Sequence, residues 1–304
     1  MMRAVLFPGQ GMQYAECLAD WEKTSTAVRE LLDVAESHLK VKVTDLLDRG
    51  GRLLEDPAVL QPVLTALALG IHGELVRRGL DAGLVAGHSL GEIAALAAAG
   101  AVTSEDAVFL ATMRGRFMAD QAGIHPGGMV ALADMGISGL ADALARGRGQ
   151  GVLDIAAHNS PREWVLSGDH AAIGAVLAVY PGRRLDVAGP WHASTMMPAE
   201  RAFRSVMEDC SLSKPGIGLI GNLDGKPLDD PAVMPKLIAG QLTNPVAWTA
   251  VMATMDSLGI EEYVIPGPGK VLRGLVRANL GRSIPARVVQ YPSALGFFEE
   301  EGRS

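Results

Sequence analysis

A serine between two glycines is the residue in this sequence best suited to covalent chemistry. The run from Leu84 to Glu92 reads LVAGHSLGE, so an apolar strand-like stretch enters a Gly-x-Ser-x-Gly turn at Ser89 and leaves as an Ala-rich helix. Strand, sharp turn and helix are the context of a nucleophile elbow. The N–H of Leu90, at the helix start, can stabilise an oxyanion beside the serine. The elbow predicts acyl transfer through a serine ester, and a plain turn with an N-cap serine is the alternative.

Ser89 needs a general base near neutral pH, and the sequence contains seven histidines. His192 is the candidate, because it lies in the Gly-Pro loop GPWHAS at the junction of two expected units. Its alternative is a turn histidine bonded to the backbone. His88 adjoins the serine, but neighbouring side chains on a tight turn point apart, so we expect a structural role. The others fall in helical patterns or in the expected insert: His38, His72, His125, His158 and His170.

A second glycine loop, FPGQGMQ at residues 7–13, follows the first expected strand. It can bring a backbone N–H or the amide of Gln10 close to the elbow. A dinucleotide fingerprint would need a glycine at Tyr14, and a phosphate loop would need a following lysine, but the sequence has neither. The phosphate-cradle interpretation of this loop is therefore weak.

The composition is that of an ordinary globular protein. The chain has 304 residues, 48% of them hydrophobic, enough for one large domain with or without an insertion. A net charge of −7 argues against a general nucleic-acid binder. Polar residues interrupt the longest apolar stretch, at 84–102, and the N-terminus has no long apolar segment, so we expect a cytoplasmic protein without a membrane span. Cys17 and Cys210 lack metal spacing, so we expect reduced thiols and no metal site.

Short apolar runs alternate with helical patterns, which predicts an α/β fold with a mostly parallel sheet. In the first part of the chain we expect strands at 3–7 and 84–86 and helices at 15–38, 63–78, 92–99 and 104–121. From about residue 125 the order strand, helix, strand, strand, helix, strand is typical of a ferredoxin-like unit. We predict a large α/β-hydrolase-like subdomain with a parallel sheet and the elbow, residues 1–124 and 191–304. A small ferredoxin-like subdomain, residues 125–190, is inserted into it.

Seven motifs occur in a fixed order along nearly the whole chain. They are FPGQGMQ at 7–13, GHSLGE at 87–92, MRGRFM at 113–118, NSP at 159–161, PWH at 190–192, QLTNPVAW at 241–248 and GPGKVL at 267–272. Together they resemble the malonyl-CoA:acyl carrier protein transacylase family, which includes the acyltransferases of polyketide synthases. Each motif alone is modest, whereas the ordered set is specific.

The resemblance implies that Ser89 is the nucleophile and His192 its base, with the N–H groups of Gln10 and Leu90 forming the oxyanion hole. It also implies that the backbone carbonyl of Gln241, rather than a carboxylate, orients the histidine. A neutral acceptor suits this chemistry, because transfer to a thiol asks less of the base than amide cleavage does.

Arg114 matches the family arginine that pairs with the free carboxylate of a malonyl group. A guanidinium binds a carboxylate through two hydrogen bonds and keeps its charge, so an acyl group without a carboxylate would leave the cation unpaired. The alternative is a solvated helix arginine beside Arg116. With the resemblance, a dicarboxylic acyl group becomes the expected substrate.

We expect Met12, Trp191 and Asn159 to line the acyl pocket. Met12 stands where the family often has serine, and Trp191 where it often has phenylalanine or serine. Residues 157 and 158, before Asn159, also differ from the usual pattern. Trp191, directly before the base, would narrow the pocket and favour malonyl over methylmalonyl or larger groups.

Lys270, Arg273 and Arg277 recur at helical spacing and make a basic face on an acidic protein. The residues expected on the opposite face are Val271, Leu272, Leu275 and Val276. Carrier proteins are typically acidic, so this face is a candidate docking surface. A solvated helix face is the alternative.

We therefore predict an acyltransferase that moves malonyl from malonyl-CoA to the phosphopantetheine thiol of a holo acyl carrier protein, for fatty-acid or polyketide synthesis. The route is ping-pong through Ser89, the donor is a coenzyme A thioester, and no bound cofactor is expected. We expect a monomer without nucleic-acid or membrane partners. The alternatives are a dedicated transacylase of a polyketide assembly line or of malonate decarboxylase, a serine hydrolase or thioesterase, and a silent binding module whose serine is never acylated.

Overall fold

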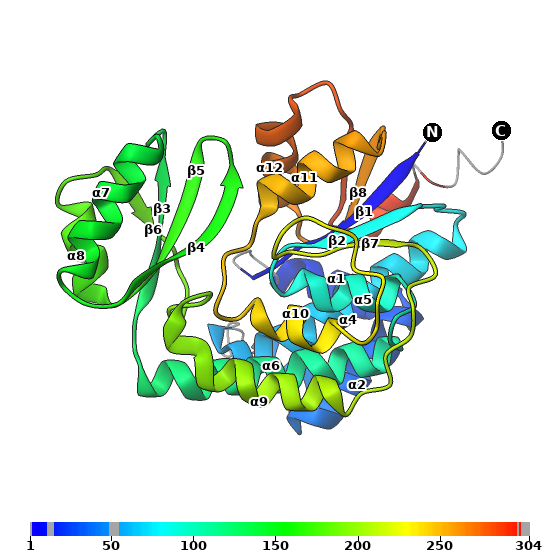
Figure 1. Ribbon diagram of the computed structural model, residues 1–304. Coiled ribbons are helices and arrows are strands. Elements are labelled where there is room, and N and C mark those ends of the chain that lie inside the picture. Colours follow the sequence, from blue (N-terminus) through cyan, green and yellow to red (C-terminus); the bar gives the residue numbers. More distant parts are fainter. Residues whose placement is uncertain (1, 11–14, 49–54, 297, 299–304) are drawn as a thin grey trace.

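A five-stranded parallel sheet forms the centre of the computed structural model, which describes residues 2–10, 15–48, 55–296 and 298 (Figure 1). The strand order is β7-β2-β1-β8-β9, and every neighbouring pair is parallel. The strands are β1 (Arg3–Phe7), β2 (Leu84–Gly87), β7 (Gly218–Ile220), β8 (Glu262–Pro266) and β9 (Ala286–Val289). β1, β2 and β8 are buried along almost their whole length, as expected for parallel strands covered by helices on both faces.

Helices cover both faces of this sheet (Figure 1). One face carries α11 (Trp248–Ser257) and α12 (Lys270–Leu280), and the other carries α4 (Pro57–Arg77) and α5 (Gly91–Ala98), with α6 (Ser104–Ile124) packed against these two helices. The second face is thickened by α2 (Thr26–Leu39), α9 (Met197–Glu208) and α10 (Met234–Gly240). The remaining helical elements around this sheet are α1 (Ala15–Thr24), α3 (Val43–Asp48) and the 3₁₀ turns η2 (Ser194–Met196) and η3 (Pro292–Leu295). The predicted α/β layering is confirmed.

Two helices differ from their sequence-based predictions. The helix expected at 15–38 is split, because Ser25 ends α1 and caps α2: its hydroxyl oxygen accepts a hydrogen bond from the N–H of Val28 at 3.2 Å and its O–H donates to Glu74 at 2.5 Å. The helix expected to begin at residue 63 begins at Pro57, because Asp56 caps it and proline fits the first turn.

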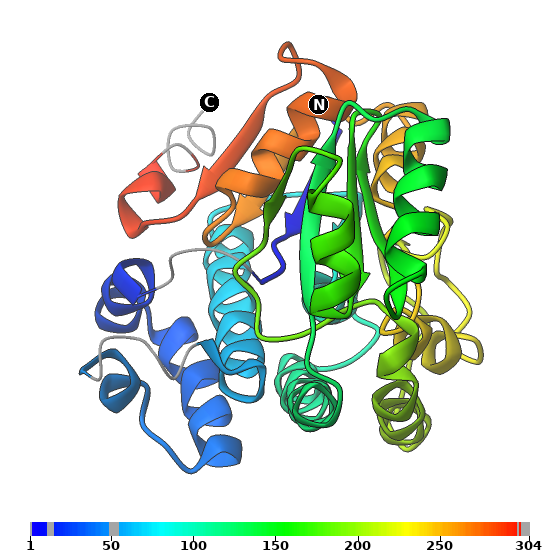
Figure 2. The same ribbon diagram turned by 90° about the vertical axis from the view of Figure 1, so that its left-hand side faces the viewer.

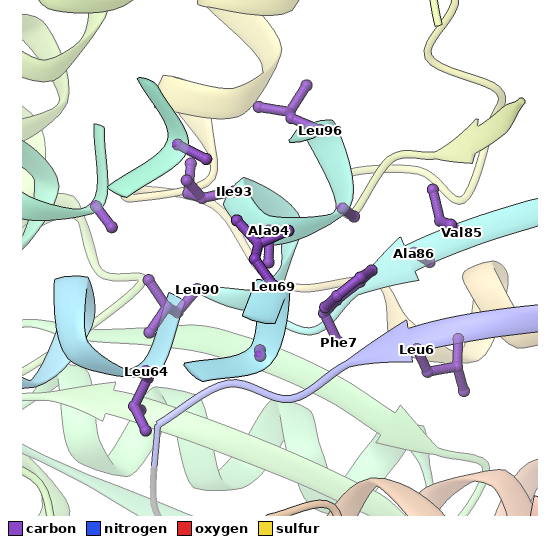
Figure 3. Close-up of a cluster of buried hydrophobic side chains, with 14 of the residues drawn as sticks. Leu6, Phe7, Leu64, Leu69, Val85, Ala86, Leu90, Ile93, Ala94 and Leu96 are labelled. Carbon is purple, nitrogen blue, oxygen red and sulfur yellow. The ribbon is translucent and has the colours of Figure 1, made fainter. Parts of the chain in front are cut away.

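The main hydrophobic core lies between the parallel sheet and α4 and α5 (Figure 3). Phe7 from β1 and Ala86 from β2 approach Leu69 from α4 and Ala94 from α5. By length and composition α4 would be able to cross a membrane, but 78% of its most apolar window is buried inside the protein. α4 is therefore a core helix, and its apolar character comes from its position between the sheet and the outer helices.

A second, antiparallel sheet lies beside the first (Figures 1 and 2). Its strands are β3 (Gly128–Ala133), β4 (Leu153–Ser160), β5 (Glu163–Gly168) and β6 (Gly182–Arg184), in the order β4-β5-β3-β6. α7 (Ile137–Arg148) and α8 (His170–Leu177) cover one face and enclose a separate small core. This is the ferredoxin-like order of strands and helices, as predicted. We call this unit, from β3 to β6, the small subdomain.

The strand register brings three loops to one edge of the parallel sheet. Phe7 pairs with Gly87, and Ala86 pairs with Ile220, so β1, β2 and β7 end level with one another. The segments that follow these strands leave the sheet side by side, and they carry Gly9, Ser89 and Asn222. The carboxyl edge of a parallel sheet is where open α/β folds place their ligand sites.

Gly91 packs too closely against β1 to accept a side chain. A Cβ at this position would lie 2.1 Å from the carbonyl oxygen of Phe7. We expect Gly91→Ala to lower the free energy of unfolding by about 1–3 kcal/mol, because the backbone has to move. Gly274→Ala is the control: it lies on α12, a Cβ there meets nothing within 4 Å, and it should stabilise by up to about 1 kcal/mol. Urea unfolding measures both, and equal midpoints would contradict the close packing.

Candidate active site

Ser89 lies on a strained turn between β2 and α5. Its φ angle is 52°, in the left-handed region that residues with side chains rarely adopt. Asn222, just after β7, holds this turn: its Oδ1 accepts from the N–H of Ser89 at 2.9 Å, and its Nδ2 donates to the carbonyl of Gly87 at 2.5 Å. Positive φ, flanking glycines and a strand-to-helix transition together give the geometry of a nucleophile elbow.

His192 contacts the hydroxyl of Ser89. Its Nε2 lies 2.8 Å from Ser89 Oγ, and its Nδ1 lies 2.7 Å from the backbone carbonyl oxygen of Gln241, the residue that follows α10. Because a carbonyl only accepts, Nδ1 carries the hydrogen and Nε2 is left to accept from the serine O–H. The structure thus brings together three residues that are distant in sequence, in the arrangement expected of a serine, its base and an orienting acceptor.

His192 is held in its neutral form. The side chain is 5% exposed, and burial, followed by the positive charge of Arg114, lowers the pKa of the imidazole to about 3. The hydrogen bond to the Gln241 carbonyl acts in the opposite direction. At neutral pH the ring is therefore free to accept a proton from Ser89.

Arg114 on α6 is buried beside the same serine and is only 1% exposed. Nη1 donates to Oε1 of Gln61 at 2.8 Å, and Nη2 donates to Oε1 of Gln241 at 2.8 Å and to Oγ of Ser89 at 3.3 Å. Burial lowers its pKa to about 10, with Glu92 opposing, so the guanidinium keeps its charge. The solvated helix arginine considered as an alternative is instead its neighbour Arg116, which is exposed.

The backbone around Ser89 offers an unused donor. The N–H of Ser89 bonds to Asn222, that of Gly91 to the His88 carbonyl and that of Glu92 to the Ser89 carbonyl. Within the described ranges, the N–H of Leu90 has no hydrogen-bond acceptor. It therefore stays available for an oxyanion at Ser89.

The loop that carries Gln10 lies against the elbow. The N–H of His88 donates to the Phe7 carbonyl at 3.0 Å, and a Cβ at Gly9 would lie 2.7 Å from the His88 carbonyl oxygen. Gln10, the next residue, therefore follows a backbone segment in contact with the turn. The position of its N–H relative to Ser89 Oγ stays a prediction.

The three expected pocket residues have different surroundings. Met12 lies outside the described residues. Asn159 is largely buried, with Oδ1 2.9 Å from Nε2 of His88 and Nδ2 donating to Glu163 at 2.8 Å, so it supports the elbow. Trp191 is buried against Gly189 in the main core. Its effect on acyl selectivity stays a prediction.

His88 has the structural role expected of it. Its ring is half-buried, bonded to Asn159 and packed against Trp248 at a centroid distance of 5.2 Å, and its partial burial lowers its pKa. Among the described residues, no three His, Cys, Asp or Glu side chains gather as metal ligands would.

Sequence reasoning missed three buried polar residues of the site: Gln61, Glu92 and Asn222. Glu92 is the last residue of the GHSLGE motif, and no role was assigned to it. Asn222 follows a strand of the parallel sheet, so its position at the carboxyl edge was the available signal. Gln61 lies in the second turn of α4, and no local pattern marks it.

The basic face of α12 is exposed at Lys270 and Arg277 and half-buried at Arg273. Val271 was predicted to pack on the apolar side of this helix. That prediction was wrong, because Val271 is 57% exposed. The apolar seam of α12 consists of Leu272, Leu275 and Val276. Val271 therefore extends the accessible surface around the three basic residues.

Comparison with known proteins places this geometry in a family. The acyl transferase domain family matches residues 5–260. The malonyl CoA-acyl carrier protein transacylase of Mycobacterium tuberculosis is 34% identical over 307 residues, covering 97% of this chain and 98% of that protein. The Escherichia coli protein of the same name is 30% identical over 300 residues, covering 96% and 97%.

Solved structures agree over nearly the whole chain. The malonyl-CoA:ACP transacylase of Synechocystis has a TM-score of 0.89 at 28% identity and covers 98% of this chain and 100% of that one. A structure described as a type II PKS acyl-carrier protein in complex with its malonyl-transacylase has a TM-score of 0.92 at 26% identity, covering 99% and 100%. With its elbow, its Ser-His pair and its buried arginine, the chain belongs to the malonyl CoA-acyl carrier protein transacylase family of acyl transferases.

Proposed function

We propose that this acyltransferase moves a malonyl group from malonyl-CoA to the phosphopantetheine thiol of an acyl carrier protein, through an ester on Ser89. One observation carries the proposal: Oγ of Ser89 lies 2.8 Å from Nε2 of His192 and 3.3 Å from Nη2 of Arg114. The reacting oxygen is thus flanked by a neutral base and by a fixed positive charge. The names of the relatives support the same donor and acceptor.

In the first half-reaction, Ser89 Oγ attacks the thioester carbonyl carbon while its proton passes to Nε2 of His192. The oxyanion accepts hydrogen bonds from the N–H of Leu90 and, by our prediction, of Gln10. The carbon–sulfur bond then breaks, and the CoA sulfur leaves with the proton from His192. The product is an ester between malonyl and Ser89.

In the second half-reaction, the thiol of the carrier's phosphopantetheine arm replaces CoA. His192 takes the thiol proton, the sulfur attacks the ester carbonyl, and the same donors stabilise the second oxyanion. Collapse breaks the bond to Ser89 Oγ, which takes back a proton from His192. No bound cofactor is needed, because the acyl group passes from a thioester to an oxygen ester and back to a thioester without a change of oxidation state.

Arg114 would select the acyl group by its charge. One CH₂ group separates the malonyl carboxylate from the carbonyl carbon that Ser89 attacks. Nη2 of Arg114 lies 3.3 Å from Ser89 Oγ, so the carboxylate can contact the guanidinium. Binding would also neutralise a charge that lowers the pKa of His192, so the imidazole would become more basic when a malonyl group is present. An acetyl group would do neither.

The carrier and the pathway form the finer part of the proposal. We place the docking surface on the basic face of α12, at Lys270, Arg273 and Arg277, since an acidic carrier would be attracted to it. A carrier of a polyketide assembly line is a second candidate, because one structural relative is described in complex with such a carrier. We further propose that the protein acts in the cytoplasm as a monomer.

Acylation of Ser89 is the first prediction to test. Intact-protein mass spectrometry after mixing with malonyl-CoA should reveal one malonyl adduct, absent from Ser89→Ala and passed on when a holo carrier protein is added. A persistent adduct on Ser89→Ala would contradict the proposed nucleophile. An adduct lost to water while the carrier stays unmodified would favour a hydrolase, and the absence of any adduct would favour a binding module.

The selectivity prediction concerns Arg114→Met, which keeps an unbranched apolar stem but removes the guanidinium and its charge. We expect the rate of Ser89 acylation by malonyl-CoA to fall about 100-fold, since an unpaired buried carboxylate costs several kcal/mol, while acetyl-CoA reacts no more slowly. Arg116→Met, on the exposed side of α6, is the matched control and should leave both rates unchanged. Equal losses with the two thioesters would contradict the role of Arg114.

The docking prediction uses a charge reversal on α12. Lys270→Glu combined with Arg277→Glu should raise the KM for the carrier about 10-fold, mostly at low salt, because the attraction to an acidic partner is reversed. The acylation of Ser89 by malonyl-CoA should not change. Arg201→Glu on the distant helix α9 is the control (Figure 1). Equal effects of the two charge reversals would place the docking surface elsewhere.

The pH dependence of stability tests the neutral state of His192. The folded protein keeps this side chain unprotonated, whereas the unfolded chain protonates it below its ordinary pKa of 6.5. The free energy of unfolding should therefore fall as the pH drops from 6.5 towards 3, by at most about 1.4 kcal/mol per pH unit for one proton.

His72 and His88, whose pKa values burial also lowers, act in the same direction, and Glu92, whose pKa burial raises, acts in the opposite one. The comparison is therefore with His192→Gln, which removes this one proton from the balance. Between pH 6.5 and pH 5, urea unfolding should reveal up to about 2 kcal/mol more loss for the native sequence than for the variant. Parallel losses would mean that His192 is not held neutral.

A further inference from the structure

We propose that Glu92 is a positioning residue that fixes the direction of the Gln241 amide and thereby presents Arg114 to the carboxylate of the acyl group. The inference rests on the proposed function. Glu92 lies in the first turn of α5, is 2% exposed and touches none of the reacting atoms. It is nevertheless the acidic group that opposes the burial of the Arg114 charge.

Both oxygens of Glu92 accept hydrogen bonds from residues much later in the sequence that lie beside the elbow. Oε1 accepts from the backbone N–H of Asn222 at 2.7 Å, and Oε2 accepts from Nε2 of Gln241 at 2.5 Å. These two partners are the residues that hold the turn at Ser89 and orient His192. One buried carboxylate therefore ties two distant segments to the start of the nucleophile helix.

The direction of the Gln241 amide follows from its partners. Nε2 faces Oε2 of Glu92 and, at 3.1 Å, the carbonyl oxygen of Ser89, and both of these only accept. Oε1 faces Nη2 of Arg114 at 2.8 Å, which only donates. With the amide reversed, its NH₂ group would point at the guanidinium and its oxygen would face two acceptors. Glu92, which makes the shorter of the two contacts to Nε2, thus acts with the Ser89 carbonyl to determine which end of the amide Arg114 meets.

The amide also keeps the two charges apart. A carboxylate in direct contact with Arg114 would form an ion pair and occupy the N–H groups that an acyl carboxylate needs. Here Glu92 stabilises the cation through the dipole of Gln241, and the atoms hydrogen-bonded to the guanidinium are neutral oxygens of Gln61, Gln241 and Ser89. The site can therefore hold a buried cation that still has an unmet preference for an anion.

Glu92→Gln tests this directly, because it keeps the shape and reverses the polarity of one contact. The new amide would offer its oxygen to the N–H of Asn222 and its NH₂ to Nε2 of Gln241, so two donors would meet and the Gln241 amide would lose the acceptor that helps to hold Oε1 towards Arg114. At a pH above 8, where Glu92 is ionised, we expect the rate of Ser89 acylation by malonyl-CoA to fall at least about 100-fold. The rate with acetyl-CoA should fall less than about 10-fold, so the ratio of the two rates drops at least about 10-fold.

A second variant separates polarity from packing. Adding Gln241→Glu to Glu92→Gln restores a donor facing an acceptor at each contact between residues 92, 241 and 114. It gives up the hydrogen bond to the Ser89 carbonyl and places the carboxylate directly against Arg114. We expect the melting temperature to recover towards that of the native sequence while the preference for malonyl-CoA stays low, since the guanidinium is already paired.

The outcomes are decisive. Equal losses with the two thioesters in Glu92→Gln, or an unchanged ratio, would overturn the inference and leave Glu92 a purely structural residue. The same holds if Glu92→Gln fails to fold and the double variant does not restore folding. The native sequence is measured first: if it forms no malonyl ester on Ser89, the proposed function itself has failed, whatever the two variants do.

Discussion

The turn at Ser89 is the constraint on which the rest of the site depends. Its φ angle of 52° lies in the left-handed region, which costs a residue with a side chain on the order of 1–3 kcal/mol. Two hydrogen bonds from Asn222 hold the turn, and Gly91 allows the loop after β1 to close over it. His192 has the same unusual backbone conformation, with φ at 61°. Both members of the pair are thus held in conformations that the chain alone would disfavour, so their contact depends on the packed sheet edge.

Electrostatics imposes a second requirement, because a buried cation and a buried anion each lose hydration worth several kcal/mol. Arg114 and Glu92 meet this requirement together while the amide of Gln241 keeps them apart. A direct ion pair would satisfy the two charges equally well, but it would leave no attraction for the carboxylate of a substrate. His192 stays neutral in the same environment, since protonating it would add a second positive charge beside the first. The arrangement therefore favours an anionic acyl group by leaving one charge partly unsatisfied.

The sequence predicted what local patterns determine. The elbow, the ferredoxin-like order of the small subdomain and most helices follow from glycine positions and apolar spacing in short windows. Asn222, Gln61 and the role of Glu92 were missed, because their partners are brought close only by the strand register and by the packing of α4. The break at Ser25 was missed for a similar reason: its hydroxyl is bonded to Glu74 on another helix. The resemblance to a family supplied the contact between His192 and the Gln241 carbonyl, which no pattern in one sequence reveals.

Strand β4 of the small subdomain contacts both sides of the site. Asn159, near one end of β4, bonds to the ring of His88, the residue before the nucleophile. Asp154, near the other end, accepts hydrogen bonds from the N–H and the hydroxyl of Ser194, two residues beyond the base. The two halves of the pair come from segments 103 residues apart, yet both are attached to the same strand. One strand of the small subdomain therefore supports both the turn that carries the nucleophile and the loop that carries the base.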